Sequence, residues 1–428
     1  MRAPLGRPTS GDIVGGVTTF LTMAYIVVIN PTILATRGTG MPFSGVLTAT
    51  VLLCTTMTLF MGLYARLPFG VAPGMGINAF FTYSIVLGQH VPWQTALGMV
   101  FWAGVLFLLI SVTPLREQIA RAIPKNLRIA SAVGIGLFLT FIGLKNAGIV
   151  AADPVTFVRL GHFGTDAAIF GAGMLVAAVL LARKSPFAFL ATIGVGTVIA
   201  LGLGTTHAPA SLVSTPDFTS VALHLDITGA LSLAFAPAII ALMFTDLFDS
   251  ISTFVGVSSA ANLLDEDGQP KNLRQGLIVD AFATLTAGLF GTSSGTAYIE
   301  SAAGIEAGGR SGWTAVVTAL CFLPCLFIAP IAGMVPAAAT APVLVLVGAI
   351  MFRSSRALEL EHLEDTVPAF VTIVLIPLTF SITQGLLWGF ISHVVLYVLV
   401  GRARQITPML WLIAAVSVVL VVLGQRAP

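Results

Sequence analysis

Charged residues are scarce in this sequence. Asp, Glu, Lys and Arg make up 9% of its 428 residues, whereas hydrophobic residues make up 57%. A soluble domain has about 25% charged residues, so water is not the main solvent of this chain. Apolar runs long enough to cross a bilayer as a helix recur from end to end. The sequence therefore predicts a polytopic membrane protein and excludes a soluble enzyme with one large core.

Cysteine is also rare, and basic patches are missing. Cys54, Cys321 and Cys325 all lie in apolar stretches and form neither a C-x-x-C pair nor a Cys/His cluster. We therefore expect no disulfide, no metal and no other cofactor. The net charge is only +2, and no basic stretch is interleaved with aromatic residues, which excludes nucleic acid as a partner.

Hydropathy, punctuated by Gly, Pro and charged residues, predicts fourteen membrane-spanning segments in two sets of seven. The first set is 12–34, 44–65, 75–88, 93–112, 127–147, 166–182 and 187–204. The second set is 233–256, 273–289, 296–308, 312–332, 338–352, 367–381 and 384–400. A further apolar stretch, 408–424, is either an extra span or a helix packed on the rim.

These segments predict an all-α membrane protein built from two repeats, 1–204 and 233–400, followed by a C-terminal segment, 401–428. Because each repeat has an odd number of helices, the second must be inverted relative to the first. With the N-terminus in the cytoplasm, the loops place all but four of the 20 Lys and Arg residues inside, as the positive-inside rule requires. The exceptions are Arg37, Lys145, Arg159 and Arg426.

The third segment of each repeat is unusually short and follows a run rich in Gly, Pro or Ser. These runs are VAPGMGIN at 71–78 and FGTSSGTAYIE at 290–300. Irregular backbone at membrane depth must line a cavity or be buried in protein. Interrupted segments at corresponding places in two halves therefore predict a binding site near the middle of the bilayer.

Several acidic residues lie inside the predicted spans, where an ionised carboxylate is costly and usually functional. Asp246 and Asp249 are three residues apart and so share one helix face. We assign ligand binding to Asp246, with Asp249 as its orienting or proton-relay neighbour. Glu300 follows the second break closely and is assigned to ligand or proton binding. Asp280 either relays protons or bonds to a neighbouring helix end.

Three uncharged residues near the breaks are further candidates. Asn78 offers a donor and an acceptor to a ligand, although an Asn beside a Gly-rich turn is often a local cap. Phe80 has the shape to stack on a flat ring, but packing in the core or against lipid is the more common role of Phe. Thr296 either bonds to the ligand or satisfies the backbone of the broken segment.

Four stretches of the chain resemble the AzgA-like purine permeases, a branch of the nucleobase-cation symporters. They are DIVGGVTTFLTMAYIVVINP at 12–31, APGMGINAFF at 72–81, FTDLFD at 244–249 and GTSSGTAYIESAAGI at 291–305. The likeness extends in order over nearly the whole chain, and four long motifs together are far more specific than any one of them.

This resemblance implies a uracil-transporter-like fold of fourteen helices in two inverted repeats. A core domain, formed by the first four segments of each repeat, would move against a gate domain formed by the last three. The resemblance also implies import of adenine, guanine or hypoxanthine by proton symport across the cell membrane. Matched residue by residue, the substrate-contacting positions of the family fall on Asn78, Asp246 and Glu300. A homodimer is compatible with the sequence but is not indicated by it.

The chemistry of a purine agrees with this resemblance. Its N–H donors match carboxylate acceptors, and an amide completes the polar edge of the ring. As a hypothesis, Glu300 or Asp246 gains and loses a proton in step with purine occupancy.

Three other functions are alternatives to purine symport. An anion carrier of the sulfate or bicarbonate kind is disfavoured, because the spans contain several carboxylates and no deep Lys or Arg. An intramembrane enzyme would need a deep His or paired Asp residues on two helices, and we expect neither. A passive channel predicts transport that neither saturates nor depends on protons.

Overall fold

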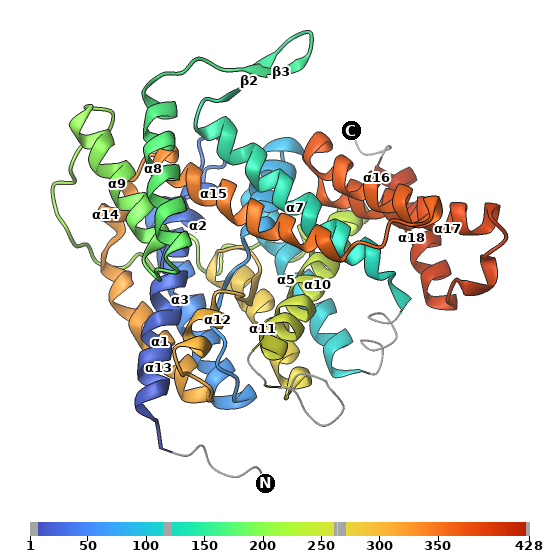
Figure 1. Ribbon diagram of the computed structural model, residues 1–428, viewed down its shortest axis with the longest axis horizontal. Helices are drawn as coiled ribbons and strands as arrows, with labels where there is room; N and C mark the ends of the chain where they lie inside the picture. The colour runs from blue at the N-terminus through green and yellow to red at the C-terminus, as the bar shows by residue number, and fades with distance from the viewer. Residues whose placement is uncertain (1–6, 114–121, 261–262, 264–270, 425–428) are drawn as a thin grey trace.

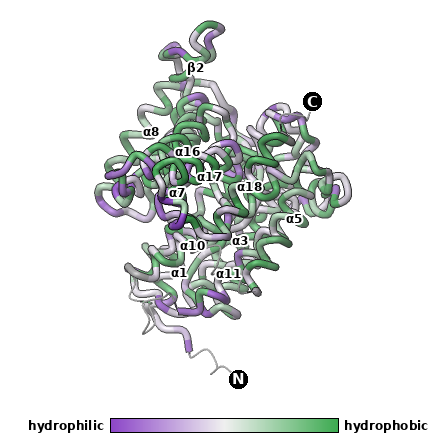
Figure 2. Tube along the Cα trace, turned by 90° about the vertical axis from the view of Figure 1, so that its right-hand side faces the viewer, coloured by the Kyte–Doolittle hydropathy of each residue, from purple (hydrophilic) through white to green (hydrophobic). Residues whose placement is uncertain are grey.

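The computed structural model describes residues 7–113, 122–260, 263 and 271–424, and helices dominate it. Within these ranges eight helices are long and apolar enough to cross a bilayer, and four shorter apolar helices accompany them. Figure 2 shows hydrophobic residues along the helices and hydrophilic residues mainly in the connections. The prediction of a mostly helical, multi-pass protein is therefore confirmed, whereas the count of fourteen crossings stays a prediction. Arg2, Arg116, Arg121 and Arg426, used to predict the orientation, lie outside the described residues.

The first half of the chain forms helices close to the predicted segments. They are α1 (Ser10–Met23), α2 (Ile26–Leu34), α3 (Phe43–Phe60), α4 (Met75–Ala79), α5 (Trp93–Val112), α7 (Lys125–Asn146), α8 (Thr165–Ala182) and α9 (Ala188–Gly202). Two π-helical stretches, Met61–Ala65 and Phe80–Gly88, extend α3 and α4. The first predicted span is divided between α1 and α2, with Tyr25 at the division.

The second half of the chain also forms helices close to the predicted segments. Its helices are α10 (Ala236–Ala260), α11 (Leu273–Phe290), α12 (Ser301–Glu306), α13 (Gly312–Phe322), α14 (Ala329–Gly333), α15 (Ala337–Phe352), α16 (Leu363–Thr379), α17 (Ile382–Leu399) and α18 (Pro408–Gly424). Short 3-10 helices cover Gly229–Leu231, Leu233–Phe235, Leu323–Phe327, Arg353–Ala357 and Ala403–Gln405.

Two short antiparallel sheets correct the all-α prediction. β1 (Val71–Pro73) pairs with β4 (Gly295–Ala297), and β2 (Val150–Asp153) pairs with β3 (Phe157–Leu160). The first sheet joins the two interrupted runs, because paired strands satisfy backbone N–H and C=O groups that Pro- and Gly-rich sequence keeps out of a helix. This pairing also shortens the tenth predicted segment: Thr296 lies in β4, and helix begins only at Ser301.

Helices far apart in sequence pack side by side in two groups (Figure 1). In the first group, α1 and α3 contact α13, and α5 contacts α10 and α11. In the second group, α15 contacts α7, α8 and α9, and α16 contacts α7 and α17. Each half of the chain contributes helices to both groups, so neither half folds as a separate body.

The connector between α9 and α10 runs along the first group of helices. The Asp217 carboxylate accepts hydrogen bonds from the hydroxyls of Ser44, at 2.9 Å, and Ser220, at 2.6 Å. The Asp217 N–H donates to the Thr48 hydroxyl at 3.0 Å. Ser44 and Thr48 both belong to α3. These bonds, the one from Ser220 foremost, hold the pKa of Asp217 below its ordinary value.

This lowered pKa makes the connector sensitive to acid. A carboxyl whose pKa is lower in the folded state stabilises the fold above its unfolded pKa, about 4, and loses that effect as the pH falls through the folded pKa. We expect Asp217→Asn to lower the Tm by about 2 °C at pH 7. Near pH 3 the difference from the wild type should shrink, and thermal unfolding of the detergent-solubilised chain across this range measures it. A constant difference at every pH, or an equal effect of Glu361→Gln at an exposed site, would contradict the assignment.

Candidate functional site

The two interrupted runs meet in the β1–β4 sheet, which joins the two halves of the chain. Val71 lies opposite Ala297, and Pro73 lies opposite Gly295. Beyond the strands, the Gly74 N–H donates to the Ser294 carbonyl at 2.9 Å. Both strands are buried. The sheet therefore supplies satisfied backbone at a depth where unpaired amides would be costly, and it positions the side chains around it.

Asn78 lies in the short helix that follows β1. Its side chain is buried, and its Oδ1 accepts a hydrogen bond from the Ser293 hydroxyl in the run that precedes β4. Its Nδ2 has no hydrogen-bond partner among the described residues. A buried amide with an unused donor costs free energy unless a ligand or water completes it.

Asp246 lies on α10 and is fully buried against α11 and the second interrupted run. Its Oδ2 accepts hydrogen bonds from the Ser294 hydroxyl, at 2.7 Å, and from the Thr284 hydroxyl. Its Oδ1 has no partner within the described part of the chain. One oxygen thus anchors the run before β4, and the other retains its capacity to accept a hydrogen bond.

Asp280, on α11, and Thr296, in β4, are also buried. The Asp280 Oδ2 accepts a hydrogen bond from the Ala297 N–H at 3.2 Å, and the Thr296 hydroxyl lies 3.2 Å from that of Ser250 on α10. Asp280 therefore bonds to the strand, not to a helix end. Its Oδ1 is unpartnered in the described ranges.

Glu300 and Asp249 differ from these residues because their side chains are only half-buried. Glu300 accepts a hydrogen bond from the Tyr25 hydroxyl at 2.6 Å. The carboxyls of Asp249 and Glu300 are near enough for their charges to act on each other, and Asp280 is within similar reach of Asp249. The structure thus brings the carboxyls predicted from three separate segments into one cluster.

Phe80 is 1% exposed and belongs to the main hydrophobic core. The structure accordingly shows core packing of this ring. Phe80 contributes to the site by anchoring the segment that carries Asn78.

Two residues that the sequence analysis did not identify contact Glu300 or the second interrupted run. Tyr25 lies where the first span divides into α1 and α2, and its side chain is buried. Asn30, in the following turn, donates from Nδ2 to the hydroxyls of Thr50, at 2.6 Å, and Thr292, at 2.8 Å. A polar side chain inside a predicted span was the available signal in both cases.

The expectation that no histidine lies deep in the protein was wrong. His393 is 4% exposed within α17, where its ring packs against that of Tyr397. The Tyr397 hydroxyl donates to Asp365 on α16 at 2.8 Å, so the carboxyl that this pair contacts is not one of the acidic cluster. Among the described residues, no group of three His, Cys, Asp or Glu side chains is arranged to hold a metal ion.

Comparison with proteins of known sequence and structure places this geometry in a family. A sequence model of one protein family, Xan_ur_permease, described as Permease family, matches residues 10–387. The chain is 39% identical to the adenine permease AdeP of Escherichia coli strain K12, over 97% of this chain and 94% of that protein. It is 38% identical to the guanine/hypoxanthine permease PbuO of Bacillus subtilis strain 168, over 93% and 94%.

Among solved structures, the transmembrane domain of a cyanobacterial bicarbonate transporter, BicA, has the same fold. The TM-score is 0.65, at 18% identity, over 89% of this chain and 97% of that one. The named relatives are permeases, so the chain is a transporter and not an enzyme. The extent of these matches confirms the resemblance seen in the motifs: the chain belongs to the Xan_ur_permease family, together with adenine and guanine/hypoxanthine permeases.

Proposed function

We propose that this chain imports purine bases, namely adenine, guanine or hypoxanthine, by proton symport across the cell membrane. The observation that carries the proposal is the acidic cluster at the junction of the two interrupted runs. There, Asn78 Nδ2 and Asp246 Oδ1 retain unused hydrogen-bonding capacity, and the carboxyls of Asp249 and Glu300 are partly exposed. The relatives named as adenine and guanine/hypoxanthine permeases supply the substrate class.

The positions of the carboxyls suggest a division of roles. Among the carboxyls of the cluster, Asp249 and Glu300 combine partial exposure with free acceptor capacity, so they accept N–H groups of the purine. This proposal gives Asp249 the ligand contact that the sequence assigned to Asp246, which is buried. Asn78 donates to a ring nitrogen or carbonyl, and Asp246 and Thr296 hold the β4 segment against α10 beside the proposed binding site. Charge-assisted hydrogen bonds of this kind are about twice as strong as neutral ones, which favours a substrate with several N–H donors.

Proton coupling is assigned to Asp249, Glu300 and Asp280. Asp249 is within reach of the charges of both Glu300 and Asp280, and neighbouring carboxyls cannot all be ionised at low cost inside a membrane protein. A proton taken up with the purine offsets that cost and leaves with the purine on the other side. Asp280 is suited to relay this proton, since one of its oxygens is committed to the Ala297 N–H and the other is free.

The proposed movement is of the elevator type, with the first group of helices as the core and the second as the gate. In this scheme the fourteen crossings form inverted repeats, the N-terminus is cytoplasmic, and a homodimer is compatible with the arrangement. Support comes from the way each half of the chain contributes to both groups of helices. Asp246 and Asp249 lie on α10 in the proposed core, and Glu300 lies in the turn before α12, which packs against α1.

An anion carrier is the alternative from the same fold, because the bicarbonate transporter shares it. The cluster argues against this function. In the described ranges, the ion pairs join Lys125 to Glu359, Arg159 to Asp153 and Arg402 to Glu364, and none of them reaches the cluster. A site with several carboxyls and no adjacent cation repels an anion.

Competition uptake tests the substrate class directly. Cells lacking their own purine carriers and expressing this chain are given labelled hypoxanthine with unlabelled adenine, guanine, hypoxanthine, xanthine, uracil, sulfate or bicarbonate. When the labelled hypoxanthine is present at a saturating concentration, a competitor of similar affinity in about tenfold excess reduces its uptake by about tenfold. We expect this from at least one of adenine and guanine, besides hypoxanthine itself, and no effect of uracil or the anions. Competition by sulfate or bicarbonate alone would replace the proposal with the anion carrier.

A further inference from the structure

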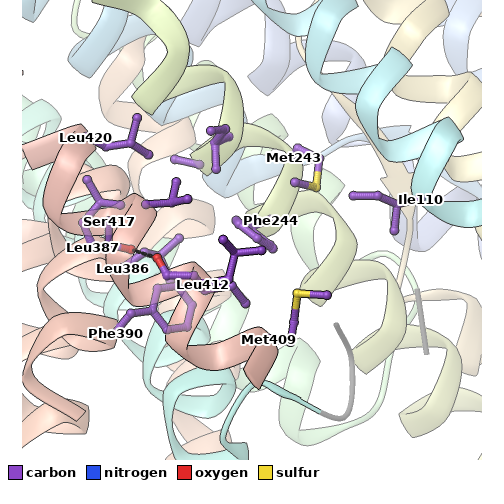
Figure 3. A pocket seen from close by; sticks show the side chains of 14 residues that line it. Ile110, Met243, Phe244, Leu386, Leu387, Phe390, Met409, Leu412, Ser417 and Leu420 are labelled. Atoms are coloured by element: carbon purple, nitrogen blue, oxygen red, sulfur yellow. Dashed lines mark hydrogen bonds between the residues drawn. The ribbon is translucent and has the colours of Figure 1, made fainter. Parts of the chain in front are cut away.

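Helix α18 has no role in the proposed transport cycle, but it forms one wall of a groove. The groove has a volume of about 220 Å³ and lies between α18, α17 and α10, with Ile110 of α5 at its edge (Figure 3). Phe244 from α10, Phe390 from α17 and Leu412 from α18 are among the residues that line it. In Figure 3, Ile110 and Met409 lie toward one end and Leu420 toward the other.

The apolar lining of the groove favours a hydrocarbon ligand over a polar one. Apart from the hydroxyl of Ser417, every lining side chain ends in carbon or sulfur. The Ser417 hydroxyl donates to the Ile413 carbonyl of its own helix at 2.8 Å, so its proton is already used. Ordered water and polar ligands each need two or more polar partners. The groove offers them too few, and its walls α10 and α17 belong to apolar helices long enough to span a bilayer.

The lining of the groove along α18 is about as long as the hydrocarbon layer of one leaflet is thick. Its lining residues on α18 run from Met409 to Leu420, roughly 16 Å along a helix axis. This is about half of the hydrocarbon thickness of a bilayer. A single acyl chain reaches that far, whereas a transmembrane helix of a second protein would need the whole thickness.

Positive charge gathers at the end marked by Ile110 and Met409. Arg274 donates to the carbonyl of Val112, two residues beyond Ile110, at 3.3 Å. Arg404 lies in the 3-10 helix just before α18. Both side chains are exposed, and guanidinium groups bind phosphate oxygens well.

We propose that this groove binds one acyl chain of a bilayer phospholipid, with the lipid phosphate at the end that carries Arg274 and Arg404. The bound chain lies between α10, which carries Asp246 and Asp249, and the C-terminal helices α17 and α18. It fills the space that α18 encloses and gives this additional helix a function.

Photolabelling tests the site in the full-length chain. The protein is reconstituted in phosphatidylcholine–phosphatidylglycerol vesicles with a trace of phosphatidylglycerol carrying a diazirine on one acyl chain, irradiated and mapped by peptide mass spectrometry. We expect adducts on groove residues of α10, α17 and α18 at about tenfold the level on other lipid-facing helices. Leu412→Trp, which fills the groove, should remove most of this labelling.

Val419→Trp is the matched control, because Leu412 is 58% exposed and Val419 is 56% exposed on the same helix, but only Leu412 lines the groove. A monodisperse gel-filtration peak confirms that each variant folds. Labelling spread evenly over exposed helices, or labelling unchanged by Leu412→Trp, would overturn the site. Covalent cross-links between two chains through α18 would also overturn it, in favour of a second copy as the occupant.

The double variant Arg274→Gln/Arg404→Gln should reduce labelling by the phosphatidylglycerol probe, and unaltered labelling would refute the phosphate position.

Discussion

Glu300→Gln and Asp249→Asn are each expected to abolish nearly all purine uptake while leaving the protein in the membrane. Each change replaces an ionisable acceptor by an amide that is neutral and presents a donor where the purine also presents one. A hydrogen bond to a charged group contributes about 1.5–3 kcal/mol, so binding should weaken by about 10- to 100-fold before any loss of proton coupling is counted. Uptake of labelled hypoxanthine, normalised to the amount of protein in the membrane, measures the effect.

Glu306→Gln is the matched control for this pair. Glu306 is exposed at the end of the same short helix that follows Glu300, so its replacement should leave uptake unchanged. Normal uptake in both Glu300→Gln and Asp249→Asn would remove the site assignment, and with it the proposed pocket.

Asp246→Asn should also abolish most uptake, but for a different reason. Its Oδ2 receives hydrogen bonds from both Ser294 and Thr284, and the neutral amide oxygen of Asn accepts these two bonds more weakly than a carboxylate does, so the support of β4 is weakened. We expect a clear fall in Tm for Asp246→Asn and an almost unchanged Tm for Asp249→Asn. The opposite order would exchange the proposed roles of the two residues.

Uphill accumulation of hypoxanthine should disappear when the proton gradient is removed. With one proton per purine, a gradient of one pH unit supports about a tenfold concentration ratio, because tenfold corresponds to 1.4 kcal/mol. Proteoliposomes with an alkaline lumen measure this ratio before and after addition of a protonophore. Accumulation that persists after the gradient has collapsed would exclude proton symport.

The variant Asp280→Asn separates proton coupling from purine binding. The amide oxygen of Asn can still accept the hydrogen bond from the Ala297 N–H, so β4 should remain in place, whereas no proton can be carried at this position. We expect exchange of internal for external hypoxanthine to continue and accumulation against a gradient to be lost. Asp153→Asn in the β2–β3 hairpin serves as the control. Full accumulation by Asp280→Asn would show that the relay does not include this residue.

The positions of the helices could be read from the sequence because the bilayer imposes a local requirement. A segment needs about 20 apolar residues to cross, and each stretch meets this requirement without reference to the rest of the chain. The interruptions near 71–78 and 290–300 were visible for a similar reason, since Gly and Pro disfavour helix wherever they occur. Acidic residues inside the predicted spans likewise indicated the segments whose carboxyls the structure brings together.

Only the tertiary structure decided which side chains meet there. Asp246 and Asp249 share a helix face in sequence, yet one is sealed against α11 and the run before β4 while the other is half-exposed near Glu300. Tyr25 reaches Glu300 across 275 residues of chain, and Asp280 finds its partner in a strand that helical periodicity does not predict. Helical spacing determines neighbours three and four residues apart. Contacts between helices depend on how the two halves pack, and no local pattern in the sequence specifies that.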